Sequence, residues 1–261
     1  MKCDIYQVDA FTNNIFSGNP ACVIPLKEWI EDSILLKIAQ ENAVPETAFF
    51  VYDRDDINLR WFTPDQEIDL CGHATLATAY ILHSVLKYPK NEICFKTMSG
   101  DLKVTFKEGF YYLDFPSRKP QPAVLPTEIE LSINIQPKEV FKSRDYMLVY
   151  DTQKDVESIS INRQYFDKIN LGHGGVITTS IGNSCDFVSR FFTPQATILE
   201  DSVTGSAHCT LIPFWSSRLH KQELSALQIS KRGGELLCVN MLDRVIIGGQ
   251  ARLYSQGECM F

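Results

Sequence analysis

Three side chains are the candidates for moving a proton in this chain: Glu46, His73 and Asp201. Glu46 lies between Pro45 and Thr47, after a predicted helix and before an apolar predicted strand. A carboxylate held partly out of water at such a junction gains proton affinity, so it can act as a general base or acid near neutral pH. An ordinary surface glutamate at a turn is the alternative that position alone leaves open.

A repeated motif divides the candidates between two related halves. Residues 60–64 (Arg-Trp-Phe-Thr-Pro) return as residues 190–194 (Arg-Phe-Phe-Thr-Pro), an offset of 190 − 60 = 130. Residues 71–73 (Cys-Gly-His) correspond to residues 204–206 (Thr-Gly-Ser), an offset of 205 − 72 = 133. Each glycine opens a predicted helix of small residues. Two facing helix N-termini would make a binding place for an anion.

The second helix start offers hydroxyl groups and a carboxylate. Asp201, Thr204 and Ser206 surround Gly205, and such residues commonly cap a helix. They can equally share the exposed amides of the helix with a substrate carboxylate. The duplication of this composition favours substrate binding.

His73 and Cys71 flank the first of these glycines, Gly72. The helix dipole is expected to lower the pKa of His73 and keep its imidazole neutral, with a capping or core histidine as the alternative. The same position is expected to lower the pKa of the Cys71 thiol, which makes it a candidate nucleophile or base. Because Thr204 stands at the matching place, a symmetric mechanism with two thiols is excluded.

The composition is that of a globular protein, with 44% hydrophobic and 22% charged residues among 261. A net charge of −7 argues against a nucleic-acid partner, and no apolar run is long enough for a membrane span. The sequence has none of the common nucleotide, flavin or zinc motifs, and its eight cysteines form no Cys-x-x-Cys pair. We therefore expect no cofactor, no metal and reduced thiols in the cytoplasm.

The hydrophobic pattern predicts many short strands with one buried helix in each half, which indicates an α+β protein. The buried helices are expected over 74–86 and 206–219, and the proline-rich segment 116–126 is predicted to be a linker. Further expected elements are a helix over 31–42, strands over 5–10, 21–25, 47–52, 57–62, 93–97, 102–106, 111–115, 146–150, 175–179, 185–192 and 245–254, a polar turn at 53–56, and a bulge or close backbone approach at 248–249.

Taken together, the motifs resemble the phenazine-biosynthesis PhzF-like family, which shares the diaminopimelate epimerase fold. The resemblance runs nearly end to end. It rests on residues 8–12 and 16–21, 38–39, 46–49, 60–64, 69–75, 192–194, 200–201, 204–207 and 248–251.

The resemblance implies two similar domains, here 1–117 and 118–261, and leaves open whether the final strand packs back on the first. Each would be a curled, mostly antiparallel sheet or open barrel around a central helix, with the active site in the cleft between them. It implies catalytic roles for Glu46, His73 and Asp201. It also implies a substrate carboxylate held near Gly72, Gly205 and Ser206, with Thr204 beside them, and a homodimer.

The resulting hypothesis is a cofactor-independent isomerase that moves a proton on a small carboxylate by general acid–base catalysis. Two alternatives stay open: an amino-acid epimerase or racemase that uses Cys71, and a non-catalytic binder of small carboxylates.

Overall fold

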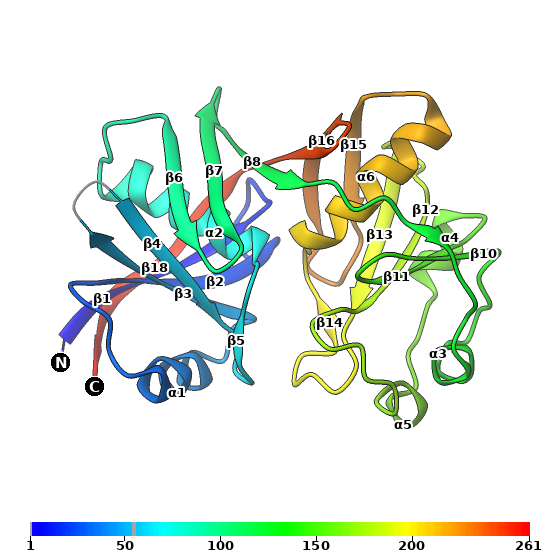
Figure 1. Ribbon diagram of the computed structural model, residues 1–261, viewed down its shortest axis with the longest axis horizontal. Coiled ribbons are helices and arrows are strands. Elements are labelled where there is room, and N and C mark those ends of the chain that lie inside the picture. The colour runs from blue at the N-terminus through cyan, green and yellow to red at the C-terminus, as the bar shows by residue number, and fades with distance from the viewer. Residues whose placement is uncertain (1, 54–55) are drawn as a thin grey trace. The chain divides into compact units, whose positions relative to one another are not determined.

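The computed structural model describes residues 2–53 and 56–261 (Figure 1). The predicted polar turn at 53–56 includes residues 54 and 55, which lie outside the described residues. The chain divides into two compact units. Unit 1 comprises Met1–Phe115 and Ile247–Phe261, and unit 2 comprises Pro116–Ile246. Among the described helices, none combines the length and the apolar composition required to cross a bilayer.

Unit 1 is a curled sheet that surrounds one helix, α2. Strand β2 pairs antiparallel with β1 and parallel with β3, β4 pairs antiparallel with β3 and parallel with β6, and β6, β7 and β8 form a meander. The last strand, β18, pairs antiparallel with β1. The elements are β1 (Lys2–Ala10), β2 (Asn19–Leu26), α1 (Asp32–Asn42), β3 (Glu46–Asp53), β4 (Asp56–Phe62), β5 (Glu67–Ile68), α2 (Gly72–Tyr80), the π-helix η1 (Ile81–Val85), β6 (Glu92–Thr97), β7 (Gly100–Lys107), β8 (Phe110–Pro116) and β18 (Ala251–Met260).

Unit 2 repeats this order of pairing around helix α6. Strand β11 pairs antiparallel with β10 and parallel with β12, and β13 pairs antiparallel with β12 and parallel with β15, which pairs antiparallel with β16. The elements are β9 (Gln121–Pro122), α3 (Thr127–Ser132), β10 (Glu139–Lys142), β11 (Tyr146–Val149), α4 (Gln153–Glu157), α5 (Arg163–Phe166), β12 (Val176–Ile181), β13 (Phe187–Phe192), β14 (Glu200–Asp201), α6 (Gly205–Leu219), β15 (Glu223–Gln228), β16 (Gly234–Met241) and β17 (Arg244–Gly249), which leads back into unit 1.

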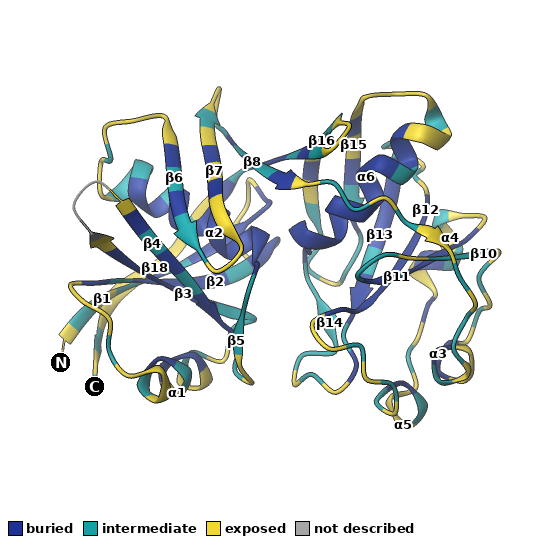
Figure 2. Cartoon of the chain, in the orientation of Figure 1, coloured by how far each residue is buried: buried dark blue, intermediate teal, exposed yellow. Residues whose placement is uncertain are grey.

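Both central helices are buried along most of their length, as the dark colour of α2 and α6 in Figure 2 shows. A helix that is apolar on all sides can only be stable inside a core. The first was expected as one helix over 74–86, but the α-helix ends at Tyr80 and continues as η1. In α6, Pro213 has no amide to donate to the carbonyl of Cys209, and that carbonyl instead accepts a 2.8 Å hydrogen bond from the amide of Arg118.

The repeated arginine motif holds the turn that leads into each central helix. Arg60 donates to both oxygens of Glu67, at 2.7 Å each. Arg190 likewise donates to both oxygens of Glu200, at 2.7 and 2.9 Å. Such bidentate, charge-assisted pairs are geometrically specific. They therefore fix β5 against β4 and β14 against β13, just before the two helices begin.

The close backbone approach predicted at 248–249 is confirmed at Gly249. A Cβ atom at this position would lie 2.3 Å from Cδ1 of Phe11 and 3.0 Å from Cδ1 of Leu76. No side chain fits there, because Phe11 and Leu76 are completely buried. The predicted single strand over 245–254 is instead divided into β17 and β18 at this point.

We expect Gly249→Ala to lower the free energy of unfolding by about 1–3 kcal/mol, since an added methyl group must displace core side chains. The matched control is Gly257→Ala, where a Cβ would meet nothing within 4 Å. Denaturant unfolding of both variants measures the difference. Equal stability of the two would contradict this account of Gly249.

Candidate active site

Glu46 opens strand β3 and is fixed there by its neighbours on both sides. Helix α1 ends at Asn42, and its C-cap residue Ala43 has a left-handed conformation (φ 52°) that turns the chain toward the sheet. The next residue after Glu46, Thr47, is completely buried and accepts a 3.1 Å hydrogen bond from Asn42. Glu46 itself pairs with Ala21 of β2 in parallel register. The carboxylate therefore projects from a rigid strand end, with 14% of its side chain exposed.

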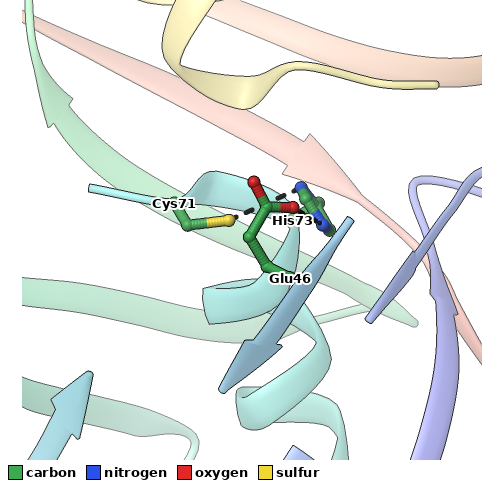
Figure 3. Close-up of side chains that lie close together, drawn as sticks. All are labelled: Glu46, Cys71 and His73. Atoms are coloured by element: carbon green, nitrogen blue, oxygen red, sulfur yellow. Dashed lines mark hydrogen bonds and ion pairs between the residues drawn. The ribbon is translucent and has the colours of Figure 1, made fainter. Parts of the chain in front are cut away.

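The start of α2 brings two further predicted residues to this carboxylate (Figure 3). Cys71 is the extended N-cap residue of α2, and His73 lies in the first turn. Nε2 of His73 is 2.9 Å from Oε2 of Glu46, and its other ring nitrogen, Nδ1, is 3.6 Å from Sγ of Cys71. His73 is buried, with only 3% of its side chain exposed. Three groups that can hold a proton thus converge at one helix start.

Asn19 completes the surroundings of His73. Its side-chain nitrogen Nδ2 lies 3.0 Å from Nδ1 of His73, and the residue is completely buried at the start of β2. As the amide is placed, Nδ2 donates to Nδ1 of the neutral ring, whose proton is then on Nε2. When the ring is doubly protonated, Nδ1 is a donor and the amide must present its oxygen instead. Asn19 therefore orients the imidazole from behind, as second partners of catalytic histidines commonly do.

In unit 2, Asp201 and Thr204 also lie together. The hydroxyl of Thr204 donates to Oδ2 of Asp201 at 2.6 Å. Gln228, a buried residue of β15, accepts from the amide of Thr204 at 2.8 Å and donates to the backbone oxygen of Asp201 at 2.8 Å. The segment before α6 is therefore held rigidly, and the Thr204 side chain is occupied by Asp201.

Ser206 is the second residue of α6 and matches His73 in the repeat. It is buried, and its hydroxyl oxygen accepts a 3.0 Å hydrogen bond from Nη2 of Arg144. Gly205 precedes it, with no side chain over the first helical amide. The first turn of α6 contains no acidic residue and has no side-chain cap.

The two units differ at the position of Glu46. Thr47 pairs with Phe62, and Val176 pairs with Phe192, so the preceding residues Glu46 and Gly175 are structural counterparts. A Cβ on Gly175 would lie 2.4 Å from Cζ of Phe191 and 2.7 Å from the backbone oxygen of Phe192. Unit 2 therefore has no space for an acid where unit 1 has its carboxylate.

The sequence profile described as phenazine biosynthesis-like protein, PhzC-PhzF, matches residues 8–257. The chain belongs to this family. It is similar to an uncharacterized isomerase of Pseudomonas aeruginosa, with 43% identity over 258 residues that cover 98% of each chain. The PhzF-like chain described here is thus an enzyme of the isomerase class.

Solved structures agree with this assignment. The crystal structure of a PhzF family protein from Enterococcus faecalis is similar over 100% of both chains, with 44% identity and a TM-score of 0.94. A predicted epimerase from Pseudomonas aeruginosa shares the fold, with a TM-score of 0.74, 17% identity and 99% coverage of each chain. The predicted PhzF-like family and α+β, epimerase-like fold class are confirmed.

The electrostatics of His73 correct one expectation for this PhzF-like enzyme. Burial lowers the pKa of His73, but the adjacent Cys71 and Glu46 raise it more, and the net direction is well above the ordinary value of 6.5. The prediction of a lowered pKa was wrong. It considered the partial charge of the helix N-terminus, whereas the carboxylate of Glu46 is a full charge in direct contact.

The expectation of a lowered pKa for Cys71 was also wrong. Burial raises the pKa of this thiol to about 11, and the Glu46 carboxylate adds to the increase. His73 and the amide of Ala74 act in the opposite direction with less effect. Cys71 is therefore a protonated thiol at neutral pH, which is the less reactive form of a cysteine.

The same three side chains are the candidate for a metal site. Their donor atoms all lie within 4.8 Å of one another. Glu46 lies closest to Nε2 of His73, and Cys71 lies closest to Nδ1. Metal–ligand bonds of about 2.0–2.3 Å would allow donor atoms this close together to share one ion. The expectation that the protein needs no metal stays a prediction.

Sequence reasoning gave no role to Asn19, Gln228 or Arg144, which contact the predicted residues. Asn19 is within one of the family motifs, so a signal was present there. Gln228 and Arg144 lie on other strands and loops, and nothing local in the sequence indicates their contacts.

Proposed function

We propose that this PhzF-like enzyme moves a proton on a small carboxylate without a cofactor, with Glu46 as the group that takes and returns the proton. The contact between Glu46 and His73 carries the proposal. Oε2 of Glu46 is buried toward His73, so Oε1 is the oxygen available to a substrate. A carboxylate fixed in this way needs little reorganisation before it reacts.

His73 supports both forms of the base. Its Nε2 lies 2.9 Å from Oε2 of Glu46 and holds the carboxylate in place while Glu46 takes a proton from carbon and returns it. His73 is then the proton-tuning group, because it touches the reacting carboxylate rather than the substrate carbon.

The asymmetry of the repeat supports a mechanism with one base. A racemase that uses two bases needs an acid–base group on each face of the substrate carbon, and the counterparts of Glu46 and Cys71 are Gly175 and Thr204. A single carboxylate can instead remove a proton from one carbon and return it to another on the same face. This is an isomerisation by proton shift.

We extend the proposal to unit 2, with the roles that the family resemblance implies. Asp201 tunes or relays the proton. Each helix start, at Gly72 in α2 and at Gly205 and Ser206 in α6, offers amides that stabilise negative charge on a ligand. Thr204 contributes by orienting Asp201, because its hydroxyl donates to that carboxylate.

The experiment that tests the proposal is incubation of the enzyme with a panel of small unsaturated carboxylates in D₂O. After treatment with a chelator, we expect deuterium from solvent to enter one substrate carbon as the double bond shifts, detected by proton NMR. Activity that disappears with the chelator and returns with added metal would overturn the cofactor-independent mechanism.

The alternative that uses Cys71 as a base is tested by Cys71→Ala. We expect exchange in this variant to stay within about tenfold of the wild-type rate, because burial raises the pKa of the thiol to about 11 and keeps it protonated at neutral pH. Cys209→Ala, which removes a buried thiol of α6, controls for loss of packing. Complete loss of exchange in Cys71→Ala alone would favour the thiol mechanism.

A further inference from the structure

The hydroxyl oxygen of Ser206 accepts a hydrogen bond, whereas its proton is not donated to another group of the described residues. The residue is buried, with 7% of its surface exposed. Arginine carries donors only, so Ser206 Oγ must accept the 3.0 Å hydrogen bond from Nη2 of Arg144. Among the residues that the structure describes, the Ser206 proton has no acceptor. Buried donors normally have a partner, so this proton is directed at something that the chain alone does not provide.

Arg144 is held in place from behind by a buried acid. Its Nε donates to Oδ1 of Asp145 at 3.3 Å, and Asp145 is completely buried. The same oxygen accepts a 2.9 Å hydrogen bond from the amide of Gly175. A Cβ on Gly174 would lie 2.7 Å from the backbone oxygen of Arg144. The glycine-rich loop formed by residues 172–175 therefore positions the Arg144–Asp145 pair.

The corresponding segment of unit 1 makes a related contact. By strand register, Tyr146 matches Cys22, which places Asn19 and Ser143 at equivalent positions. Asn19 contacts His73, the second residue of α2, and Arg144, next to Ser143, contacts Ser206, the second residue of α6. At equivalent places in the repeat, unit 1 thus has the neutral amide of Asn19 against the titratable ring of His73. Unit 2 has the cation of Arg144 against the hydroxyl group of Ser206.

We propose that Arg144 is a positioning residue that makes Ser206 an obligate hydrogen-bond donor to a substrate carboxylate at the start of α6. The positive guanidinium, the free Ser206 proton and the first-turn amides all favour a negative ligand. This inference rests on the proposed function, since it assigns a role to Arg144 in holding the same carboxylate.

The experiment measures binding of benzoate and of succinate by calorimetry, at constant ionic strength set with chloride. Arg144→Gln alone leaves Asp145 buried without its cation and is expected to be unstable. The informative variant is therefore the double substitution Arg144→Gln/Asp145→Asn, which removes both charges together. Arg144→Lys keeps the charge with one ammonium group, and Ser206→Ala removes the hydroxyl.

We expect the double variant to unfold at the wild-type denaturant midpoint and to raise the Kd of the tighter-binding carboxylate roughly 10- to 100-fold, as expected for loss of a charge-assisted hydrogen bond. Arg144→Lys should lie between the double variant and wild type. Adding Ser206→Ala to the double variant should cause little further loss, because both act on one hydrogen bond.

Wild-type affinity in the stable double variant would overturn the inference, as would a wild-type enzyme that binds inorganic phosphate but neither carboxylate. Glu46→Gln in the same titration separates the two proposals, because it should keep carboxylate binding. Binding that depends on Arg144 without any proton exchange would leave this inference standing and overturn the proposed function.

Discussion

Glu46→Gln is expected to abolish exchange of substrate protons with solvent, lowering the rate by roughly 10²–10⁴-fold. The amide keeps the size of the carboxylate and can still contact His73, so the fold and the binding of a carboxylate should be retained. It has no basic oxygen with which to take a proton from carbon. Proton NMR of the substrate in D₂O measures the rate, and calorimetry measures binding.

The matched control is Glu41→Gln, which makes the same chemical change on the exposed side of α1. It should exchange at the wild-type rate. If Glu46→Gln also exchanged at that rate, Glu46 would have no part in the chemistry, and the proposed mechanism would fail.

His73→Gln is expected to destabilise the protein by about 1–3 kcal/mol at pH 6, the range for removing the partner of a buried polar group. The folded-state pKa of His73 is raised above 6.5. Stabilisation from such a group is fully present below the unfolded pKa and is lost as pH rises through the folded pKa. The difference in unfolding free energy between wild type and variant should therefore shrink between pH 6 and pH 9.

Denaturant unfolding at both pH values measures this difference. His173→Gln, in an exposed loop, is the control and should leave stability nearly unchanged at either pH. A difference for His73→Gln that grows with pH would mean that His73 is stabilised as the neutral ring, contrary to its contact with Glu46.

The sequence pattern was sufficient for the repeat and for the family. Residues 60–64 and 190–194 share types and spacing because each segment contains the arginine of the same arginine–glutamate pair. Local interactions of this kind can be recognised from the amino-acid sequence. The two buried helices were equally visible, because an apolar surface on all sides requires a core. Glu46 and His73 were identified as candidates from their side-chain types and from their positions at the start of a predicted strand and of a predicted helix.

The details of the site could not be predicted from the sequence, because they depend on distances between side chains rather than on side-chain types. The pKa of His73 rises instead of falling because β3 places a carboxylate 2.9 Å from Nε2. The continuation of α2 as a π-helix has no local sequence signal that we identified. Ser206 and Arg144 are 62 residues apart, and one more arginine in a loop looks like any other surface arginine.

The sequence by itself determined which residues are chemically able to move a proton and that the chain is built from two related halves, since side-chain type and periodicity are properties of the letters. Only the tertiary structure decided that the acid of one half has a glycine as its counterpart in the other and that Arg144 supports Ser206. Strand register and helix placement set these relations, and both arise from packing between segments far apart in the chain.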